Sequence, residues 1–430
     1  MKRIRTGCAG VVVAVLSWGC SSSNDAGQAP KTGNAAGAPT SGGGSEAGSA
    51  GTAANPAGGN ATAGSSAASG GATGGSATGG GATGGTSSSG AAAGGSAGGS
   101  IEPVSPTPQA KWENVTSNLA GMASECGNLG RVSSHPKADM LLVGVAKKGL
   151  FSSTDGGATW NPLGTTGATI TNRISYVAYD PAAPMTFWES GIYNGGGVYK
   201  TTDNGASFTA AGTVTHCDSV SVNFSDPARM SLLAGSHEQS QKLFRSIDGG
   251  ANWTDIGKAL PTGSGFCTTS LIFDTKTFVV GCGGWYGGTP GIMRTIDGGD
   301  SFQQVSDKGV AGQPLLASDG SIYWAGHQAG GLYKSTDQGK TFAQVADPTQ
   351  AKSVEPIELP DGRIVTIGAT ALMASADHGT SWQPLADALP FAPNGVAYSP
   401  FRNAFYVWQW DCKDVVLPNA IMRFGYDYRK

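Results

Sequence analysis

Charged residues and histidines are scarce in this 430-residue sequence, and neither kind forms a cluster. Only 13% of the residues are charged and the net charge is -3, without a basic patch, so nucleic acid is not an expected partner. The five histidines lack a metal-binding spacing such as His-Glu-x-x-His. Phosphate-binding glycine loops, Ser-His-Asp signatures and Cys-x-x-Cys pairs are missing as well, so we expect no metal site and no cofactor.

Long hydrophobic runs are also missing. The apolar run at 11–16 is too short to span a bilayer, but it follows three basic residues in the layout of a secretory signal. We therefore predict a signal peptide at 1–20 and export of the protein.

The residues around Cys20 resemble a bacterial lipoprotein cleavage site, in which small residues precede a cysteine that becomes lipidated. That family prefers a leucine three places before the cysteine, whereas Leu16 lies four places before Cys20. With Ser21 after it, an anchored protein would go to the outer membrane. A secreted protein with an unmodified Cys20 is the alternative.

Residues 21–110 consist almost entirely of Gly, Ala, Ser and Thr. Such a segment cannot bury enough apolar surface to offset its ordering entropy, so we predict a disordered tether. Random-coil scaling over roughly 90 residues gives a reach of about 50 Å. Nine of the ten tryptophans follow this segment, and we assign the folded domain to 111–430.

One eight-residue phrase occurs six times in the folded domain. Its first copy is Ser-Thr-Asp-Gly-Gly-Ala-Thr-Trp at 153–160, and its aspartate returns at intervals of 40 to 49 residues. The six aspartates are Asp155, Asp203, Asp248, Asp297, Asp337 and Asp377. Between copies lie short strand-like runs with turn residues and no helical periodicity. Four short strands per repeat at this period indicate the antiparallel blade of an all-β propeller.

The phrase suits a hairpin between the third and fourth strands of a blade. Asp155 can accept backbone N–H bonds in the turn, Gly157 allows a positive φ, and Trp160 can pack between blades. The pattern S/T-x-D-x-G-x-S/T-W/F resembles the Asp-box, or bacterial neuraminidase repeat, of sialidase-like propeller proteins over nearly all of 111–430. Asn252 is its one departure. In that family the boxes face away from the active sites.

Six copies of the phrase predict six blades, but 48 residues follow the last copy. They contain three further strand-like runs, and Trp-Glu-Asn-Val-Thr at 112–116 is similar to the fourth strands of the repeats. We predict that this N-terminal strand completes a seventh blade and so removes the exposed sheet edges. A six-bladed propeller is the alternative.

Functional residues are expected on the face opposite the phrase hairpins, where the loops between second and third strands meet the starts of the innermost strands. The candidate catalytic carboxylates are Glu189, Asp218, Glu238, Glu355 and Asp411. The candidate ligand-binding residues are Arg131, Arg173, Tyr193, His216, His237, Trp285, Tyr286, His327 and Trp410. Rings beside carboxylates and amides suit a sugar, and hydrolysis of a glycosidic bond needs two carboxyl groups. Blade packing for the tryptophans and local hydrogen bonding for the histidines are the alternatives.

We expect a cell-surface protein that binds a glycan or polysaccharide and that could cleave it as a glycoside hydrolase or lyase. An exo-sialidase is not expected, because the Arg-Ile-Pro motif and a third arginine of that family are missing. Xyloglucanases of this repeat class use two propellers, whereas one is predicted here. The alternative is a non-catalytic binding or assembly module for a protein partner, as in sortilin-type receptors and photosystem assembly factors. In either case we expect a monomer whose only membrane contact is a lipid on Cys20.

Five cysteines lie in the folded domain, so at least one thiol is unpaired within the chain. Cys267 and Cys282 flank a predicted hairpin symmetrically and should face each other, where a disulfide could form. Cys126 and Cys412 lie at the ends of the first and seventh blades and could form a second pair. Cys217 would then be a buried thiol.

Overall fold

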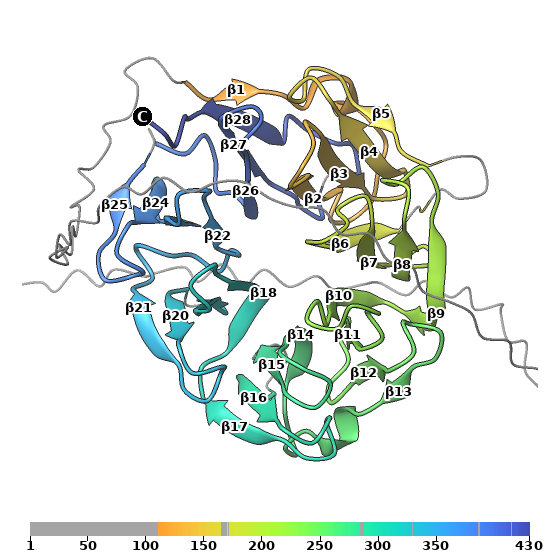
Figure 1. Ribbon diagram of the computed structural model, residues 1–430. Coiled ribbons are helices and arrows are strands. Elements are labelled where there is room, and N and C mark those ends of the chain that lie inside the picture. Colours follow the sequence, from red (N-terminus) through yellow and green to blue (C-terminus); the bar gives the residue numbers. More distant parts are fainter. Residues whose placement is uncertain are drawn as a thin grey trace, which may run out of the picture. The chain divides into compact units, whose positions relative to one another are not determined.

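The computed structural model describes residues 111–164, 170, 172–283, 288–328, 330–385, 388–413 and 415–430. These residues form seven four-stranded antiparallel sheets arranged as blades around a central axis (Figure 1), which confirms the seven-bladed prediction. Two 3-10 turns, η1 (Ser117–Leu119) and η2 (Gly257–Ala259), interrupt the sheets. In this part of the chain we find no helix with the length and apolar character of a membrane span.

Each blade is named by its order along the ring, and its strands run from the axis outward. Blade one comprises β2 (Leu129–Ser134), β3 (Leu141–Val145), β4 (Gly149–Ser153) and β5 (Asn161–Pro162). Blade two comprises β6 (Arg173–Tyr179), β7 (Phe187–Ile192), β8 (Gly197–Thr201) and β9 (Thr209–Thr215). Blade three comprises β10 (Cys217–Val222), β11 (Leu232–Ser236), β12 (Leu243–Ser246) and β13 (Thr254–Asp255). Blades four and five comprise β14 (Phe266–Ile272), β15 (Phe278–Gly283), β16 (Gly291–Thr295) and β17 (Gln303–Ser306); and β18 (Val310–Leu316), β19 (Ile322–Gly326), β20 (Leu332–Ser335) and β21 (Ala343–Ala346). Blades six and seven comprise β22 (Ile357–Glu358), β23 (Ile364–Ile367), β24 (Leu372–Ser375) and β25 (Gln383–Pro384); and β26 (Gly395–Ser399), β27 (Ala404–Trp408), β28 (Ile421–Gly425) and β1 (Glu113–Asn114).

The N-terminal strand closes the ring, as the sequence predicts. Strand β1 pairs antiparallel with β28 and becomes the outermost strand of blade seven. Just after it, the Thr116 hydroxyl accepts bonds of 2.9 Å from the backbone amides of Ala420 and Ile421. Both ends of the domain therefore contribute to one blade, so that no blade is left with a missing strand.

The repeated phrase is a self-contained hydrogen-bonded turn. In blade one, Asp155 accepts bonds from the Thr159 amide at 2.9 Å and the Thr159 hydroxyl at 2.6 Å. The Ser153 hydroxyl donates to Asp155 and accepts from the Gly157 amide, both at 2.8 Å. Gly157 has a φ of +92° that a larger residue would resist. Asn252 stands at the seventh position of the phrase, where the pattern has Ser or Thr. Its side-chain amide donates to Asp248 at 2.7 Å in place of the hydroxyl.

The aromatic residue at the end of the phrase joins neighbouring blades. The indole N–H groups of Trp160, Trp253 and Trp382 donate to backbone carbonyls at 2.8 to 2.9 Å. These acceptors belong to Val115, Ala211 and Val345, in or next to the outermost strand of the preceding blade. The repeat therefore shapes and connects the ring, as its sequence predicts.

The core lies between the blades, where second strands are covered on both sides. All five residues of β3, and all five of β27, are buried. Two disulfides fix further contacts: Cys267 pairs with Cys282, directly opposite in β14 and β15, and Cys126 pairs with Cys412. Cys217 is a free, buried thiol.

Candidate functional site

We define the open face as the end of the propeller opposite the phrase hairpins. The loops after β7 and β11 meet there with the start of β10, because backbone bonds link them in series. The His216 amide donates to the Gly196 carbonyl at 2.9 Å, and the His237 amide donates to the His216 carbonyl at 2.7 Å. These loops bring together a set of polar side chains that we call the histidine cluster: Tyr193, His216, Asp218, His237 and Glu238.

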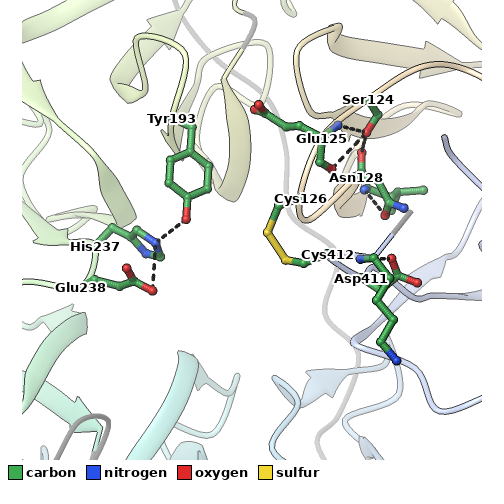
Figure 2. The surroundings of a disulfide bond; sticks show 11 residues. Ser124, Glu125, Cys126, Asn128, Tyr193, His237, Glu238, Asp411 and Cys412 are labelled. Atoms are coloured by element: carbon green, nitrogen blue, oxygen red, sulfur yellow. Dashed lines mark hydrogen bonds and ion pairs between the residues drawn. A yellow bond between two sulfur atoms is a disulfide. The ribbon is translucent and has the colours of Figure 1, made fainter. Parts of the chain in front are cut away.

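His237 is the residue of the histidine cluster with the most partners, and Figure 2 shows its contacts with Tyr193 and Glu238. Its Nδ1 lies 2.9 Å from Asp218 Oδ1, and its Nε2 lies 3.2 Å from the Tyr193 hydroxyl oxygen. Glu238 Oε1 lies 3.7 Å from the same Nε2. The Tyr193 ring meets the rings of His237 and His216 edge-on, with centroids 5.5 and 5.9 Å apart. The His237 side chain is only 16% exposed, so a hydroxyl, an imidazole and a carboxylate form a relay that is largely shielded from solvent.

The charges around His237 raise the pKa of its imidazole above 6.5. Burial acts to lower this pKa, but the hydrogen bond and the negative charge of Asp218, together with the charge of Glu238, outweigh it. The positive charge of Arg173 opposes the increase. The imidazole therefore keeps its proton to a higher pH than an unperturbed histidine, and histidine is the side chain that most often acts in acid–base catalysis.

Three residues of the histidine cluster have an energetically unfavourable left-handed backbone conformation. Tyr193, His216 and Glu238 have φ values of +59°, +53° and +51°. A left-handed conformation costs a residue with a Cβ about 1 kcal/mol or more. The phrase hairpins also place residues with a Cβ at positive φ, such as His378 with a φ of +56°. Strained backbone occurs at functional sites, but here both faces of the propeller contain it.

Arg173 lies beside the histidine cluster at the first position of β6. Its guanidinium stacks over the Trp410 ring with a distance of 4.7 Å to the centroid. Gly127 makes room for it, since a Cβ on Gly127 would lie 2.3 Å from the Arg173 Nε. The Gly127 amide donates to the Asp411 carbonyl at 2.8 Å. These two residues are the chain neighbours of Cys126 and Cys412, which form a disulfide. The disulfide therefore holds together the two loops that surround Arg173.

A second arginine, Arg131 of β2, is neutralised within the ring. Its guanidinium forms an ion pair of 2.6 Å with Glu355, which comes from the start of blade six, and lies 4.6 Å from the centroid of the Tyr176 ring. Glu355 also accepts a bond of 2.8 Å from the Gln313 amide. The ion pair connects blades one and six, which are separated by blade seven. The roles predicted for Arg131 and Glu355 stay predictions, but their contacts are those of a structural pair.

Glu189 lies in β7, inside blade two. Its side chain is fully buried and accepts a bond of 2.9 Å from the Asn172 side-chain amide. Burial raises the pKa of Glu189 to about 8, so the carboxyl is largely protonated at neutral pH. The catalytic role predicted for Glu189 stays a prediction.

The remaining predicted residues lie in separate loops. His327 follows β19 in blade five, where burial lowers its pKa, and Asp411 accepts a bond from the Lys413 amide at 3.0 Å. Trp285 and Tyr286 lie outside the described residues. Gly127 and Tyr176 were not predicted, because a glycine that makes room and a ring that faces the axis give no local sequence signal. In the described ranges, no three His, Cys, Asp or Glu side chains are arranged to hold a metal ion.

No protein-family model matches the sequence. Over 142 residues the chain is 30% identical to the Photosystem II assembly lipoprotein Ycf48 of Synechococcus sp. (strain CC9902), a match that covers 32% of this chain and 40% of that protein. A solved GH74 enzyme from Niastella koreensis has a TM-score of 0.52 and 16% identity, with 70% of this chain and 54% of that chain covered. A structure of YCF48 bound to a D1 peptide has a TM-score of 0.49 and 14% identity, with 76% and 99% covered.

These comparisons establish the class of the protein through its fold. The chain spans about two fifths of the curated relative and about half of the GH74 chain. Similarity to solved structures at such low identity concerns architecture alone. By its seven four-stranded sheets, the chain is a β-propeller protein, and its activity must be argued from its own residues.

Proposed function

We propose that the protein binds and cleaves a glycan at the histidine cluster of the open face. The observation that carries this proposal is the relay from the Tyr193 hydroxyl through His237 to Asp218, with distances of 3.2 and 2.9 Å. A hydroxyl within reach of an imidazole that is oriented by a carboxylate is an arrangement for acid–base or nucleophilic catalysis.

The surroundings of the relay suit a sugar. Trp410 and Tyr193 are partly exposed rings, and the exposed Asn194 directly follows Tyr193, with its side-chain amide donating to Glu125. Rings can stack on the apolar faces of sugars, whereas amides and carboxylates bind their hydroxyl groups. The propeller of a GH74 enzyme is a compatible precedent for the architecture.

The proposal includes export and tethering. Residues 1–20 have the layout of a secretory signal, and 21–110 have the composition of a flexible linker. Lipidation of Cys20 would retain the protein at the outer membrane, whereas its absence would release it. A surface position would bring the open face into contact with extracellular polymers.

A protein-binding scaffold is the second candidate function. The observation in its favour is the 30% identity over 142 residues with Ycf48, an assembly lipoprotein. In that case the open face would hold a polypeptide segment, and the relay would serve as a set of hydrogen-bonding groups. Binding without turnover distinguishes this candidate from the enzyme.

The test is a cleavage screen with the full-length chain and a panel of neutral and acidic polysaccharides, with new chain ends as the readout. We expect cleavage that falls about 100-fold or more in Tyr193→Phe, the typical cost of losing an acid–base group. Tyr199→Phe is the matched control, because the Tyr199 hydroxyl donates to the Gly195 carbonyl in the same blade. Absence of cleavage with every polymer, or equal activity of Tyr193→Phe and native protein, would refute the proposal.

A further inference from the structure

Among the described residues, no carboxylate forms an ion pair with Arg173. The Arg173 Nε is buried and has no hydrogen-bond partner. Arg131 also has a buried Nε without a partner, but a carboxylate lies 2.6 Å from its Nη2. Buried donors are normally satisfied, and a guanidinium matches a carboxylate with two parallel bonds. Arg173 can therefore form an ion pair with an anionic group of a ligand.

The position of Arg173 places such an anion beside the relay. In the register of β6 and β7, Arg173 pairs with Ile192, the residue that immediately precedes Tyr193. Both side chains thus start from the same end of neighbouring strands. The electrostatic effect of Arg173 on His237 agrees with this proximity. A carboxylate bound by Arg173 would leave the adjacent sugar carbons within reach of the Tyr193 hydroxyl.

Both carboxylates of the cluster contact one imidazole. Asp218 Oδ1 lies 2.9 Å from Nδ1 of His237, and Glu238 Oε1 lies 3.7 Å from Nε2. The cluster therefore offers an imidazole–phenol pair next to a carboxylate-binding arginine.

We infer that the substrate is a polysaccharide containing uronic acids, and that the open face cleaves it by β-elimination. The inference rests on the proposed function of this site and specifies its substrate class and its bond-breaking step. Arg173 binds the uronate carboxylate and thereby makes the proton on the neighbouring carbon, C5, more acidic. Electrostatic stabilisation of this kind is commonly the largest contribution to an enzyme's rate.

The elimination balances without any further reagent. Neutral His237 accepts the phenolic proton of Tyr193 through Nε2 as the Tyr193 oxygen removes the C5 proton. The electron pair of the C5–H bond forms the C4=C5 double bond, and the C4–O4 bond breaks. The proton taken from C5 passes from Tyr193 to O4 of the leaving chain, and His237 then returns the phenolic proton to Tyr193. Asp218 stabilises the transient imidazolium, and no water is consumed.

The experiment uses the full-length protein with polygalacturonate, alginate and hyaluronan, and with xyloglucan as a neutral polymer. The readouts are the ultraviolet absorbance of the unsaturated product and the product mass, which lacks the added water of hydrolysis. We expect unsaturated fragments from an acidic polymer and none from xyloglucan. Saturated fragments from any polymer would overturn the elimination and leave the proposed function standing. Binding of an acidic peptide without cleavage of any glycan would overturn both.

The role of Arg173 is tested separately with Arg173→Met. We expect kcat/KM on the acidic polymer to fall about 100-fold or more while the Tm stays that of the native protein. Arg294→Met is the control, because the Arg294 guanidinium donates to the Gln338 carbonyl at 3.1 Å on the opposite face. If Arg173→Met cleaves as fast as the native chain, Arg173 does not bind the substrate carboxylate. If Arg294→Met falls equally, the loss is not specific to the open face.

Discussion

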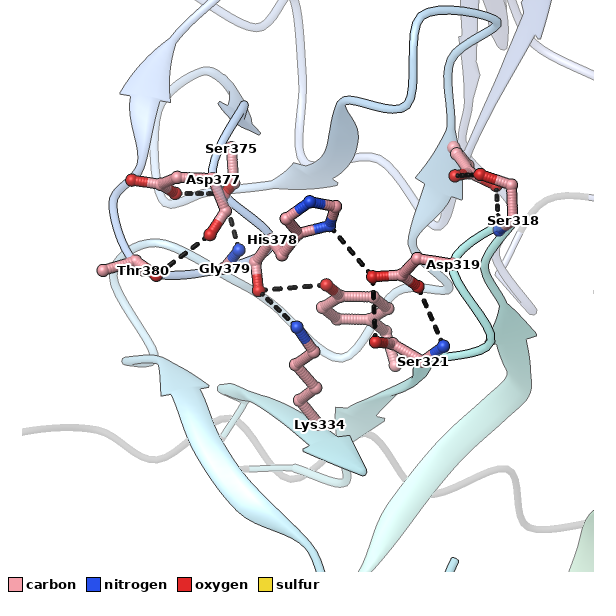
Figure 3. Close-up of polar contacts among 11 residues, drawn as sticks. Ser318, Asp319, Ser321, Lys334, Ser375, Asp377, His378, Gly379 and Thr380 are labelled. Atoms are coloured by element: carbon pink, nitrogen blue, oxygen red, sulfur yellow. Dashed lines mark hydrogen bonds and ion pairs between the residues drawn. The ribbon is translucent and has the colours of Figure 1, made fainter. Parts of the chain in front are cut away.

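The two faces of the propeller each carry a histidine–carboxylate pair, and the pairs differ in their surroundings. On the phrase-hairpin face, His378 Nδ1 lies 3.0 Å from Asp319 (Figure 3). The His378 side chain is 59% exposed, whereas that of His237 is 16% exposed. The carbonyl of His378 accepts bonds from the Tyr323 hydroxyl and the Lys334 ammonium at 3.0 and 2.9 Å. This pair belongs to a turn whose backbone is anchored by neighbouring strands.

The pair on the open face has a different second partner. His237 contacts a tyrosine hydroxyl through its other ring nitrogen, and the nearby Arg173 has a buried nitrogen without a hydrogen bond. The bonds to Asp155 are completed within its phrase hairpin, although the buried Asn204 Oδ1 of another hairpin has no hydrogen bond. We expect the first face to build shape and the second to bind a ligand. Changes on the first face should reduce stability, and changes on the second should reduce activity.

The largest effect is expected on stability from Trp160→Ala. Trp160 is 1% exposed and its indole donates to the neighbouring blade at 2.9 Å. Removal of a buried tryptophan typically costs about 3–5 kcal/mol of unfolding free energy. Denaturant unfolding measures this cost, with Phe401→Ala as a control because Phe401 is 47% exposed. Equal losses in the two variants would show that the phrase does not connect the blades.

His237→Gln should reduce turnover about 100-fold, equivalent to about 2.7 kcal/mol, while His378→Gln leaves it unchanged. The mechanism needs neutral His237, so native activity should increase with pH through a pKa above 6.5. Stability should show the opposite trend: a raised folded pKa contributes stability that is present below 6.5 and is lost as pH rises through the folded pKa. Rate and Tm profiles of the native chain and both variants measure the two trends. A pH-independent native rate, or an equal effect of the two substitutions, would contradict this role.

The two disulfides should also differ in their effect on activity. Removal of either one is expected to cost about 2–4 kcal/mol of stability. Only the Cys126→Ser, Cys412→Ser variant should also lose activity, by about tenfold, because this disulfide holds the loops around Arg173 and Trp410. The control is Cys267→Ser, Cys282→Ser, which removes a bridge between paired strands. Equal catalytic losses, measured at a temperature where both variants are folded, would contradict this positioning role.

The smallest effect concerns acid stability. Hydrogen bonds from Ser207 and Thr201 hold the pKa of Asp203 at about 2, and bonds from Asn252 and Ser246 do the same for Asp248. A depressed folded pKa contributes stability that is present above 3.8 and is lost as pH falls toward 2. The Tm should therefore decrease between these values, and Asp248→Asn should make the decrease shallower. A native Tm that is constant down to about pH 2 would show that the turn bonds do not depend on ionised carboxylates.

The ring could be predicted from the sequence because its signals are local and repeated. Each copy of the phrase specifies one hairpin, and the spacing of the copies gives the blade length. Closure by β1 was also predictable, since 112–116 are similar to the fourth strands. The Asn252 departure was visible as well, although only the structure shows its amide in the place of the hydroxyl.

The candidate site was predicted only in part, because side-chain direction is not encoded by local spacing. The sequence placed Tyr193, His237 and Asp218 on one face, and the structure shows their contacts. It gave no sign that Glu189 is buried, since all six residues of β7 are buried and no alternation marks the inner side. The Arg131–Glu355 pair depends on ring closure between blades one and six, which no local pattern reports.

The most direct test of the division between the two faces is an imidazole NMR titration of the full-length chain. With only five histidines, His237 and His378 can be assigned by their glutamine variants. The account predicts a pKa above 6.5 for His237, and a shift of its signals but not those of His378 when a uronate oligosaccharide is added. Ligand-induced shifts at His378, or none at His237 under any concentration of oligosaccharide, would contradict the assignment of chemistry to the open face.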